Sequence, residues 1–428
     1  MAAGSWRVHG NLVRPDGQVR RGTVTVAGGQ IVSLADEDSP RPDPGSPLLA
    51  TPPEAFVGPG LIDLHMHGAN GSDFMAAEPD GAHQIAAFAA RHGVTGMLAS
   101  AVTATGAAIS AALRSIAQAI SDQAASEQAA SEQASAGSPG LPPGAGPSPA
   151  RRPEARLLGA HLEGPYLSQE RRGGQDPATI RPASIAEFRQ WAALAPIRMI
   201  TVAPETGGAS ELIEFITGTH PEVVVAAGHT NASYEQARRG IDAGIRHFTH
   251  FLCGMSGFHH RQPGAAGAGL ADSPATVELI ADLVHVHPAA LLMVATARGT
   301  DKVALVTDSV NFCGLPDGSY TKRGREYQVA GGAVRLPDGT LAGSLLTMNV
   351  AVQNMAGAGA GVAAAWRMAS AVPAAILGLS HRTGALAPGM DADLAVLDEN
   401  FVPQCTIIRG QLAYARARVT AGAVPEGA

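Results

Sequence analysis

The chain has 428 residues, 45% of them hydrophobic and 16% charged, with a formal net charge of −7. This composition is typical of a globular protein with a large core, and the negative charge favours neither nucleic acid nor an anionic membrane as a partner. Cys253, Cys313 and Cys405 lack metal-finger spacing and indicate thiols in a reducing compartment. Because no signal-peptide pattern and no apolar run of ~20 residues are present, we expect a cytoplasmic protein without membrane spans.

Short alternating apolar runs open the chain between Ser5 and Leu34, broken by Pro15-Asp16-Gly17 and Gly28-Gly29. Alternation with turn residues at the breaks predicts β-hairpins. The stretch from Ser39 to Pro53 is rich in proline and predicts a surface connection. A small β unit therefore begins the chain.

From Phe56 onward, short apolar runs alternate with segments of helical character. We expect helices at 81–92, 183–194, 211–219, 233–243 and 288–298. Such alternation predicts a (β/α)8 TIM-type barrel of parallel strands. The expected strands end near His65, Ser100, His161, Ala203, Gly228, His250, Ile280 and Thr307.

One segment interrupts this alternation. Residues 121–153 contain Ala-Ser-Glu-Gln twice, at 125–128 and 130–133, followed by a tract of proline, glycine and serine. Few apolar side chains are available there to offset the entropy of ordering. We expect a disordered insertion on the outer surface, without a role in chemistry.

The last third of the chain returns to β structure. Residues 325–345 predict a hairpin around Pro337-Asp338-Gly339, residues 363–379 predict a helical region, and residues 393–397 and 405–408 predict strands. We expect these C-terminal strands to pair with the N-terminal ones in a small β-sandwich. The predicted domains are therefore 1–57 with 384–428, and a catalytic barrel at 58–383.

Polar side chains gather where the barrel strands end, which is the face that carries active sites in this fold. His65 and His67 end the first strand, and period-2 geometry places both imidazoles on one side. The other strand ends carry His161 and Glu163, His229, His250, and Asp308. Any one of these residues alone is more often a buried group satisfied by the backbone. Five strands ending this way favour a divalent metal site.

The types of ligand atom indicate which metal ions the site would bind. Imidazole and carboxylate ligands suit Zn, Fe or Mn better than Ca or Mg, and the two oxygens of Glu163 allow it to bridge two ions. Such a site makes a nucleophile from water and polarises a carbonyl. Asp308 is the best candidate for the general base that moves protons between water and leaving group.

Several motifs resemble the amidohydrolase superfamily and, within it, the N-acetylglucosamine-6-phosphate deacetylase family. The resemblance covers nearly all of the chain outside 121–153. The matching motifs are Pro-Gly-Leu-Ile-Asp-Leu-His-Met-His-Gly (59–68), His-Leu-Glu-Gly-Pro-Tyr-Leu (161–167), Gly-His-Thr-Asn-Ala (228–232), Leu-Val-Thr-Asp (305–308) and Leu-Ala-Gly-Ser-Leu-Leu-Thr-Met (341–348).

The resemblance implies a homodimer that removes acetate from N-acetylglucosamine 6-phosphate with one or two divalent ions per subunit. It implies that Arg261 and the backbone around Cys253 and Gly254 hold the sugar phosphate. The implied metal ligands are His65, His67, Glu163, His229, His250 and Asp308, and the implied sugar-lining residues are His285, Leu341, Ala342 and Gly343.

Three short segments depart from the family pattern. Gln175 stands where the family has a histidine that polarises the acetyl carbonyl, and an amide can donate a hydrogen bond but carries no charge. Cys253-Gly254-Met255 replaces Asn-Ala-Met, and Leu283 replaces a glycine before His285. Two alternatives stay open: a deacylase of another epimer or of a non-phosphorylated N-acyl amino sugar, and a catalytically silent sugar-phosphate-binding protein.

Overall fold

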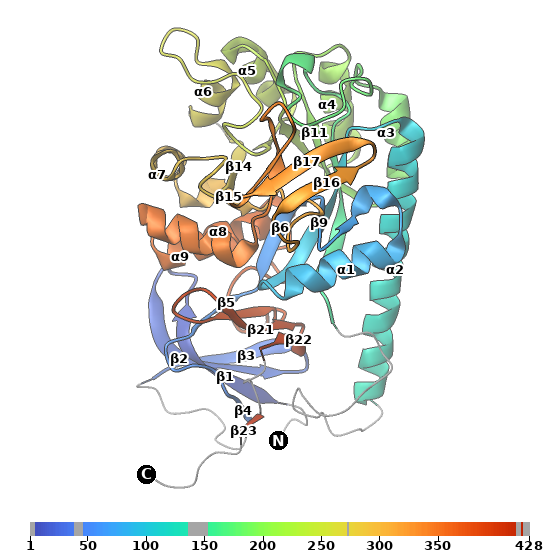
Figure 1. The fold of residues 1–428 in the computed structure, drawn as a ribbon. Coiled ribbons are helices and arrows are strands. Elements are labelled where there is room, and N and C mark those ends of the chain that lie inside the picture. Colours follow the sequence, from blue (N-terminus) through green and yellow to red (C-terminus); the bar gives the residue numbers. More distant parts are fainter. Residues whose placement is uncertain (1–4, 38–45, 136–152, 272–273, 417–420, 423–428) are drawn as a thin grey trace.

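A computed structural model describes residues 5–37, 46–135, 153–271, 274–416 and 421–422. The molecule consists of a barrel surrounded by helices and a β domain below it (Figure 1). Within the described residues, no helix is both long enough and apolar enough to cross a membrane.

Eight parallel strands form the barrel, and the predicted (β/α)8 architecture is confirmed. Their spatial order follows the sequence from β6 to β15. The ends of the sheet meet where the Asp308 amide donates to the His65 carbonyl at 2.8 Å and the His67 amide donates to the Ser309 carbonyl at 2.8 Å. The strands are β6 (Leu61–Met66), β9 (Val94–Val102), β10 (Arg156–Glu163), β11 (Ile197–Val202), β12 (Val224–Ala227), β13 (His247–Phe248), β14 (Thr276–Ile280) and β15 (Val303–Val306).

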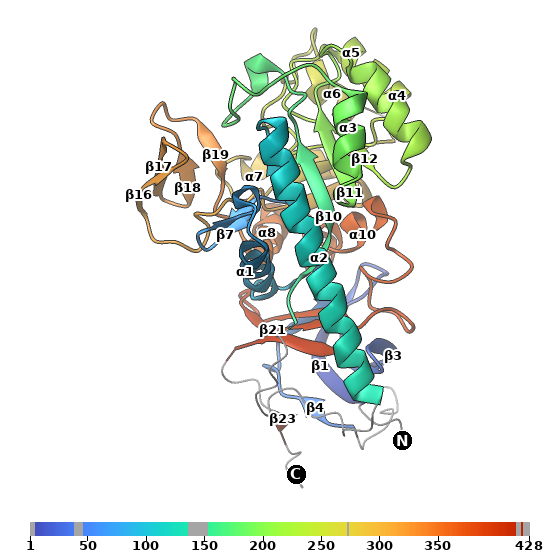
Figure 2. The same ribbon diagram turned by 90° about the vertical axis from the view of Figure 1, so that its right-hand side faces the viewer.

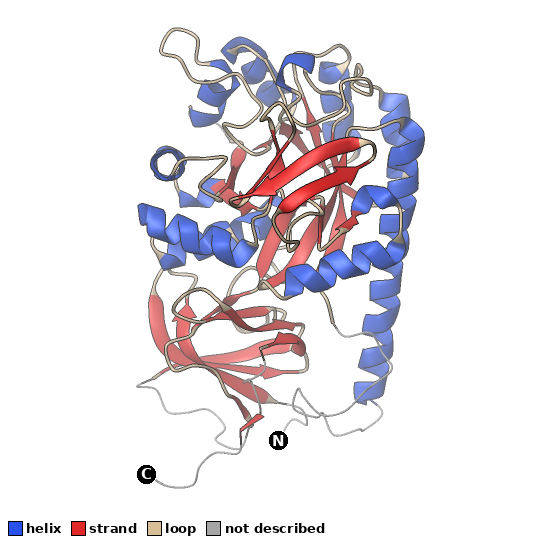
Figure 3. Cartoon of the chain, viewed as in Figure 1, coloured by secondary structure: helices blue, strands red, loops and turns tan. Residues whose placement is uncertain are grey.

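Helices pack around the outside of the barrel, as Figure 3 shows by colour. Their apolar faces are buried against the strands, as at Leu212, Ile213 and Ile216 of α4. The five predicted helices correspond to α1, α3, α4, α5 and α7. The helices are α1 (Pro79–Ala90), α2 (Gly106–Ser135), α3 (Ile185–Ala192), α4 (Ala209–Thr219), α5 (Tyr234–Ala243), α6 (Gly264–Leu270), α7 (Pro288–Arg298), α8 (Met348–Met355), α9 (Val362–Met368) and α10 (Ala371–Ile376).

The predicted β domain from both chain ends is confirmed, and hydrogen bonds join its strands into one continuous sheet. The N-terminal strand β5 pairs with the C-terminal strand β20, with Val57 opposite Val396. Alternate side chains such as Val8, Leu12 and Ile407 form a separate apolar core. The strands are β1 (Trp6–Val13), β2 (Val19–Ala27), β3 (Gln30–Asp36), β4 (Leu48–Leu49), β5 (Phe56–Pro59), β20 (Leu394–Leu397), β21 (Pro403–Ile408), β22 (Gln411–Ala415) and β23 (Ala421–Gly422).

The predicted disorder of residues 121–153 is wrong for residues 121–135, which continue helix α2. The first half of the helix has an apolar face, on which Ile109, Leu113 and Ile116 are buried. The helix then continues through alanine, glutamate and glutamine, which are strong helix formers. Figure 2 shows it running from the barrel down beside the β domain. Residues 136–152 of the predicted segment lie outside the described residues.

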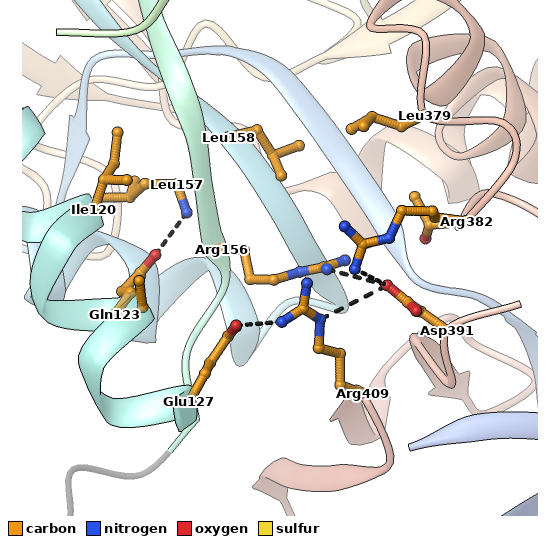
Figure 4. A pocket seen from close by; sticks show the side chains of 12 residues that line it. Ile120, Gln123, Glu127, Arg156, Leu157, Leu158, Leu379, Arg382, Asp391 and Arg409 are labelled. Atoms are coloured by element: carbon orange, nitrogen blue, oxygen red, sulfur yellow. Dashed lines mark hydrogen bonds and ion pairs between the residues drawn. The ribbon is translucent and has the colours of Figure 1, made fainter. Parts of the chain in front are cut away.

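The lower half of α2 closes a cavity of about 190 Å³ between the barrel and the β domain (Figure 4). Asp391 is one of the lining residues, and its carboxylate lies 2.9 Å from Arg382 Nη2, 3.4 Å from Arg156 Nη1 and 3.6 Å from Arg409 Nε. Arg409 also pairs with Glu127 of α2. These ion pairs join three parts of the chain.

The predicted hairpin after the eighth strand is confirmed. It belongs to a four-stranded sheet, called the hairpin sheet below, that projects beside the barrel (Figure 2). In the hairpin, Arg335 lies opposite Leu341. The strands are β16 (Gly318–Lys322), β17 (Arg325–Ala330), β18 (Ala333–Arg335) and β19 (Leu341–Ser344). A small hairpin, β7 (Gly68–Ala69) with β8 (Ser72–Asp73), follows the first barrel strand.

Candidate active site at the carboxyl ends of the barrel strands

The His-x-His motif ends strand β6 with both imidazoles buried. His65 Nδ1 lies 3.1 Å from Glu278 Oε2, and His67 Nδ1 donates to the Ser100 carbonyl at 3.1 Å. Each ring therefore points its Nε2 atom inward, and the two Nε2 atoms lie 3.1 Å apart. The period-2 geometry of the strand produces this convergence.

Asp308, just beyond β15, completes the first group of donors. Its Oδ1 atom lies 3.3 Å from His67 Nε2 and 3.7 Å from His65 Nε2. The ligand atoms of His65, His67 and Asp308 all lie within 4.8 Å of one another.

A second group consists of Glu163, His229 and His250. Glu163 Oε1 lies 3.0 Å from Nε2 of each imidazole, and these two nitrogens are 3.1 Å apart. Backbone carbonyls fix both rings, because His229 Nδ1 donates to Arg171 at 2.8 Å and His250 Nδ1 donates to Cys253 at 3.2 Å. The second group is thus preorganised in the same manner as the first.

Glu163 connects the two groups. Its Oε1 atom lies 3.6 Å from His65 Nε2, and its Oε2 atom lies 3.4 Å from His67 Nε2. One carboxylate therefore faces all four imidazoles, which is the arrangement that a bridging ligand requires.

Three of the six donor residues have left-handed backbone conformations. The φ angles are 46° at His229, 29° at His250 and 48° at Asp308. Side chains other than glycine seldom adopt such angles, and the cost is tolerated mainly at functional sites. The surrounding barrel therefore holds these residues where their side chains point into the site.

Charge at the site reflects the close contact of imidazoles with carboxylates. Burial alone would lower the pKa of His67, but contacts with Asp308 and Glu163 raise that pKa to about 10. Burial opposes the charge on Glu163 as well, yet His229 and His250 hold the pKa of Glu163 well below its usual value. The carboxylates of Glu163 and Asp308 are consequently anionic and available as ligands.

The donor set fits a divalent cation. Pairs of Nε2 atoms face each other at 3.1 Å, and such paired acceptors need a proton or a cation between them. Four imidazoles and two carboxylates are the ligands that Zn, Fe and Mn prefer.

Gln175 lies in the site, and its surroundings fix its orientation. Its Nε2 atom donates to Glu163, while its Oε1 atom accepts from the Thr103 amide at 3.0 Å. The hairpin sheet covers this loop: the Arg325 Nη1 atom donates to the Gly174 carbonyl at 2.9 Å. Ala342 lies near Gly174 as well, since a side chain at Gly174 would meet it.

The predicted sugar and phosphate residues divide into two groups. Cys253 and Gly254 adjoin the second donor group, because the Cys253 carbonyl accepts from His250 Nδ1 and a side chain at Gly254 would meet the His229 ring. His285 follows behind Cys253, whose Sγ atom lies 3.9 Å from the His285 carbonyl. Leu341, Ala342 and Gly343 belong to β19, beside Gln175 and Asp308. Arg261 is exposed on the loop after β13, where its Nη1 atom lies 2.7 Å from His260 Nε2. The structure does not place Arg261 against the six donors.

Two buried residues lie behind the donors: Glu278, which sequence reasoning missed, and His161, which it placed at a strand end without a role. Glu278 contacts His65, and the ring of His161 packs edge-on against His65 at 4.6 Å between centroids. Burial lowers the pKa of His161 well below its usual value, so its imidazole is neutral. A useful signal was available for Glu278, because a carboxylate interrupts the apolar strand Thr-Val-Glu-Leu-Ile.

A (β/α)8 barrel that gathers imidazoles and carboxylates at the carboxyl ends of its strands defines a class of metal-dependent hydrolases. The chain belongs to the amidohydrolase family, whose sequence pattern matches residues 56–413. The resemblance inferred from the motifs is thereby confirmed.

Individual relatives support the same assignment. The chain is 38% identical to an N-acetylgalactosamine-6-phosphate deacetylase of Escherichia coli O157:H7, covering 83% of this chain and 87% of the relative. It is 33% identical to an N-acetylglucosamine-6-phosphate deacetylase of Bacillus subtilis, covering 94% and 95%. A solved N-acetyl-D-glucosamine-6-phosphate deacetylase from Mycobacterium smegmatis, in complex with N-acetyl-D-glucosamine-6-phosphate, superimposes with a TM-score of 0.80 at 29% identity, covering 96% and 99%.

Proposed function

We propose that the protein removes acetate from N-acetylglucosamine 6-phosphate and releases glucosamine 6-phosphate. The observation that supports this most directly is the complete set of six donors around Glu163, in a chain whose relatives deacetylate amino-sugar phosphates. The same completeness argues against a catalytically silent sugar-phosphate-binding protein, because losing one ligand would be enough to silence the site.

In this proposal His65, His67, Asp308, Glu163, His229 and His250 hold one or two ions of Zn, Fe or Mn. A divalent ion, when bound, polarises the amide carbonyl and makes water a nucleophile at neutral pH. Asp308 takes the proton from the attacking water and transfers it to the departing amide nitrogen. Its carboxylate is ionised and free to accept that proton, because neighbouring imidazoles keep its pKa below the ordinary value even though burial opposes ionisation.

Gln175 acts on the acetyl carbonyl in our proposal. Its side-chain amide is held between Thr103 and Glu163, so its N–H groups face the donor cluster. A fixed hydrogen-bond donor next to the oxygen that gains negative charge lowers the activation barrier, because the donor does not have to reorient during the reaction.

The sugar phosphate would lie between the β13 loop and the hairpin sheet. In this proposal Cys253, Gly254 and His285 would contact the sugar phosphate from one side, and Leu341, Ala342 and Gly343 would contact it from the other. Arg261 would turn toward the phosphate from its exposed loop, because guanidinium groups suit phosphate recognition. A homodimer and a cytoplasmic location complete the proposal.

A second candidate substrate is the galacto epimer. Identity to the E. coli N-acetylgalactosamine-6-phosphate deacetylase is 38%, compared with 34% and 33% for the N-acetylglucosamine-6-phosphate deacetylases of Vibrio furnissii and Bacillus subtilis. Leu283, at a left-handed position with φ 65°, adds bulk in the turn before His285. This change alters the wall that would face the sugar.

Acetate release on a small panel tests the proposal. The panel contains N-acetylglucosamine and N-acetylgalactosamine, each with and without the 6-phosphate, and Glu163→Ala serves as the metal-deficient control. We expect turnover of a phosphorylated sugar, and loss of both turnover and metal in Glu163→Ala. An Arg261→Ala variant should raise KM for the phosphorylated sugar alone. No acetate from any phosphorylated sugar in metal-loaded protein would refute the proposal.

A further inference from the structure

Glu278 is a fully buried carboxylate in the middle of strand β14. Burying a charged group costs several kcal/mol unless other groups pair with it. Apolar residues would serve the barrel core better at this position, as Val277 and Leu279 do on either side. Core packing therefore does not explain why a glutamate occupies this position.

The two oxygens of Glu278 serve different partners. Oε2 lies 3.1 Å from His65 Nδ1 and accepts the backbone N–H of His250 at 3.0 Å. His65 belongs to the first donor group, whereas His250 belongs to the second. A single oxygen atom thus fixes one residue of each group.

His247 fixes the other oxygen. Its Nε2 atom donates to Glu278 Oε1 at 2.9 Å, and its Nδ1 atom lies 2.5 Å from Thr276 Oγ1. The side chains of His247 and Glu278 are fully buried. Thr276, His247, Glu278 and His65 therefore form a continuous chain of contacts that ends at an inward-facing Nε2 atom.

The effect on His250 is as direct as the effect on His65. His250 has a φ of 29°, a conformation that needs support from its surroundings. The hydrogen bond from its backbone N–H to Glu278 supplies that support at the strained residue itself. Loss of the bond would allow the backbone to relax and the imidazole to leave its position between Glu163 and His229.

We propose that Glu278, held by His247, is a positioning residue that sets the ligand geometry of both halves of the metal centre. The inference rests on the proposed function, because it assumes that the six donors hold metal. A carboxylate behind a ligating imidazole fixes the ring and makes its inward nitrogen more basic, and removing such a partner typically costs 10–100-fold in metal affinity.

The test compares Glu278→Gln with a matched control, Asp393→Asn. Each substitution removes one buried carboxylate charge and preserves the side-chain size, but Asp393 lies in the β domain junction, where it pairs with Arg156. Metal-free wild type and variants are titrated with Zn²⁺ against a competing chelator, and thermal unfolding is recorded in parallel. Co²⁺-loaded samples report ligand geometry through their absorption spectra.

We expect Glu278→Gln to bind Zn²⁺ 10–100-fold more weakly than wild type and to change the Co²⁺ spectrum. Asp393→Asn should lower the unfolding temperature with unchanged Zn²⁺ affinity and spectrum. Equal Zn²⁺ affinity in wild type and Glu278→Gln, or the same loss in both variants, would overturn the inference.

A second variant keeps the test decisive if Glu278→Gln does not fold. His247→Gln leaves the carboxylate in place but loosens it, so we expect a smaller loss of Zn²⁺ affinity in the same direction, and wild-type affinity in His247→Gln would contradict the inference. Wild-type protein that binds no Zn²⁺ would instead refute the metal centre of the proposed function, so the two failures are distinguishable.

Discussion

In the proposed function, Asp308 combines two tasks that place opposite demands on one side chain. As a ligand it must stay close to His67, whereas as a base it must pick up and release a proton. Its backbone is fixed on both sides, because its N–H donates to the His65 carbonyl and its carbonyl accepts from the Ser344 N–H, both at 2.8 Å. The carboxylate can therefore exchange protons without moving out of the donor cluster.

Replacing Asp308 with asparagine should separate binding from catalysis. The amide cannot act as a base, and loss of a positioned acid–base group costs on the order of 10²–10⁴-fold. We expect kcat to fall by that amount while calorimetry still detects binding of N-acetylglucosamine 6-phosphate. Turnover within a few-fold of wild type would show that another group moves the protons.

Substitutions of Gln175 test the role of the loop that the hairpin sheet covers. Removing one oxyanion donor costs on the order of 10²-fold in kcat. We expect Gln175→Ala to lose about that much with unchanged metal content, and Gln175→His to recover part of it. Steady-state kinetics with metal analysis on both variants makes the comparison. An inactive Gln175→His beside an active Gln175→Ala would contradict the assigned role.

Metal uptake should depend on pH. Burial opposes the charged imidazoles, but the carboxylates raise the pKa of His67 to about 10 and that of His250 to about 9 in the metal-free site. Both rings are therefore protonated at pH 7, and ions must displace those protons. We expect Zn²⁺ binding to release protons and its affinity to increase as the pH rises toward 9. Calorimetry in buffers of different ionisation enthalpy measures the release; buffer-independent heats would disprove it.

The six donors could be predicted because each lies at or just after the end of an apolar strand, at a point where polar residues are conspicuous. Glu278 and His247 could not be assigned in this way. A single sequence does not reveal which buried polar groups meet across neighbouring strands, and β14 and β13 pair through only two residue positions. Arg261 shows the opposite difficulty, since a family motif carries a residue type but not the conformation of an exposed loop.

At the scale of elements, the barrel strands were predictable because they are short apolar runs bounded by polar ends. Helix α2 was not among the predicted helices. Its second half has few apolar residues, so composition indicated disorder, but alanine and glutamine favour a helix and side-chain contacts anchor it. Those contacts are made with residues that follow the long insertion, and the local sequence contains no sign of them.

Gln123 is the main anchor of that second half. Its Nε2 atom donates to Glu154 Oε1 and to the Ala155 carbonyl, both at 3.0 Å, and its Oε1 atom accepts the Leu157 N–H at 2.9 Å. We expect Gln123→Ala to destabilise the protein by about 1–3 kcal/mol, the cost of unsatisfied buried polar groups, at unchanged kcat. Denaturant unfolding measures the loss.

Ser126→Ala is the matched control on the exposed side of the same helix, and it should leave stability unchanged because alanine favours the helix. An equal loss in both variants would show that the contacts of Gln123 do not anchor the helix. A deletion starting at Gln123 removes the anchor as well, so it should cost stability.

At the scale of the whole molecule, Asp391 joins the barrel to the β domain through three arginines (Figure 4). Its side chain is 13% exposed, whereas that of Arg382 is 45% exposed. We expect Asp391→Asn to destabilise the protein by about 1–3 kcal/mol, the range for hydrogen bonds to charged groups, and Arg382→Ala to cost much less. Thermal unfolding of both variants, at wild-type turnover, checks this. A larger loss in Arg382→Ala would contradict the central place of Asp391.

The pairing of β5 with β20 has a consequence for biosynthesis. Synthesis runs from the N-terminus, so β5 leaves the ribosome long before its neighbour at residues 394–397 exists. Throughout translation of the barrel, one edge of the N-terminal sheet stays open, and an open edge is a template for pairing with other chains. The β domain can therefore be completed only after translation has passed Leu397, and nascent chains arrested earlier present an unpaired strand that is open to pairing with other chains.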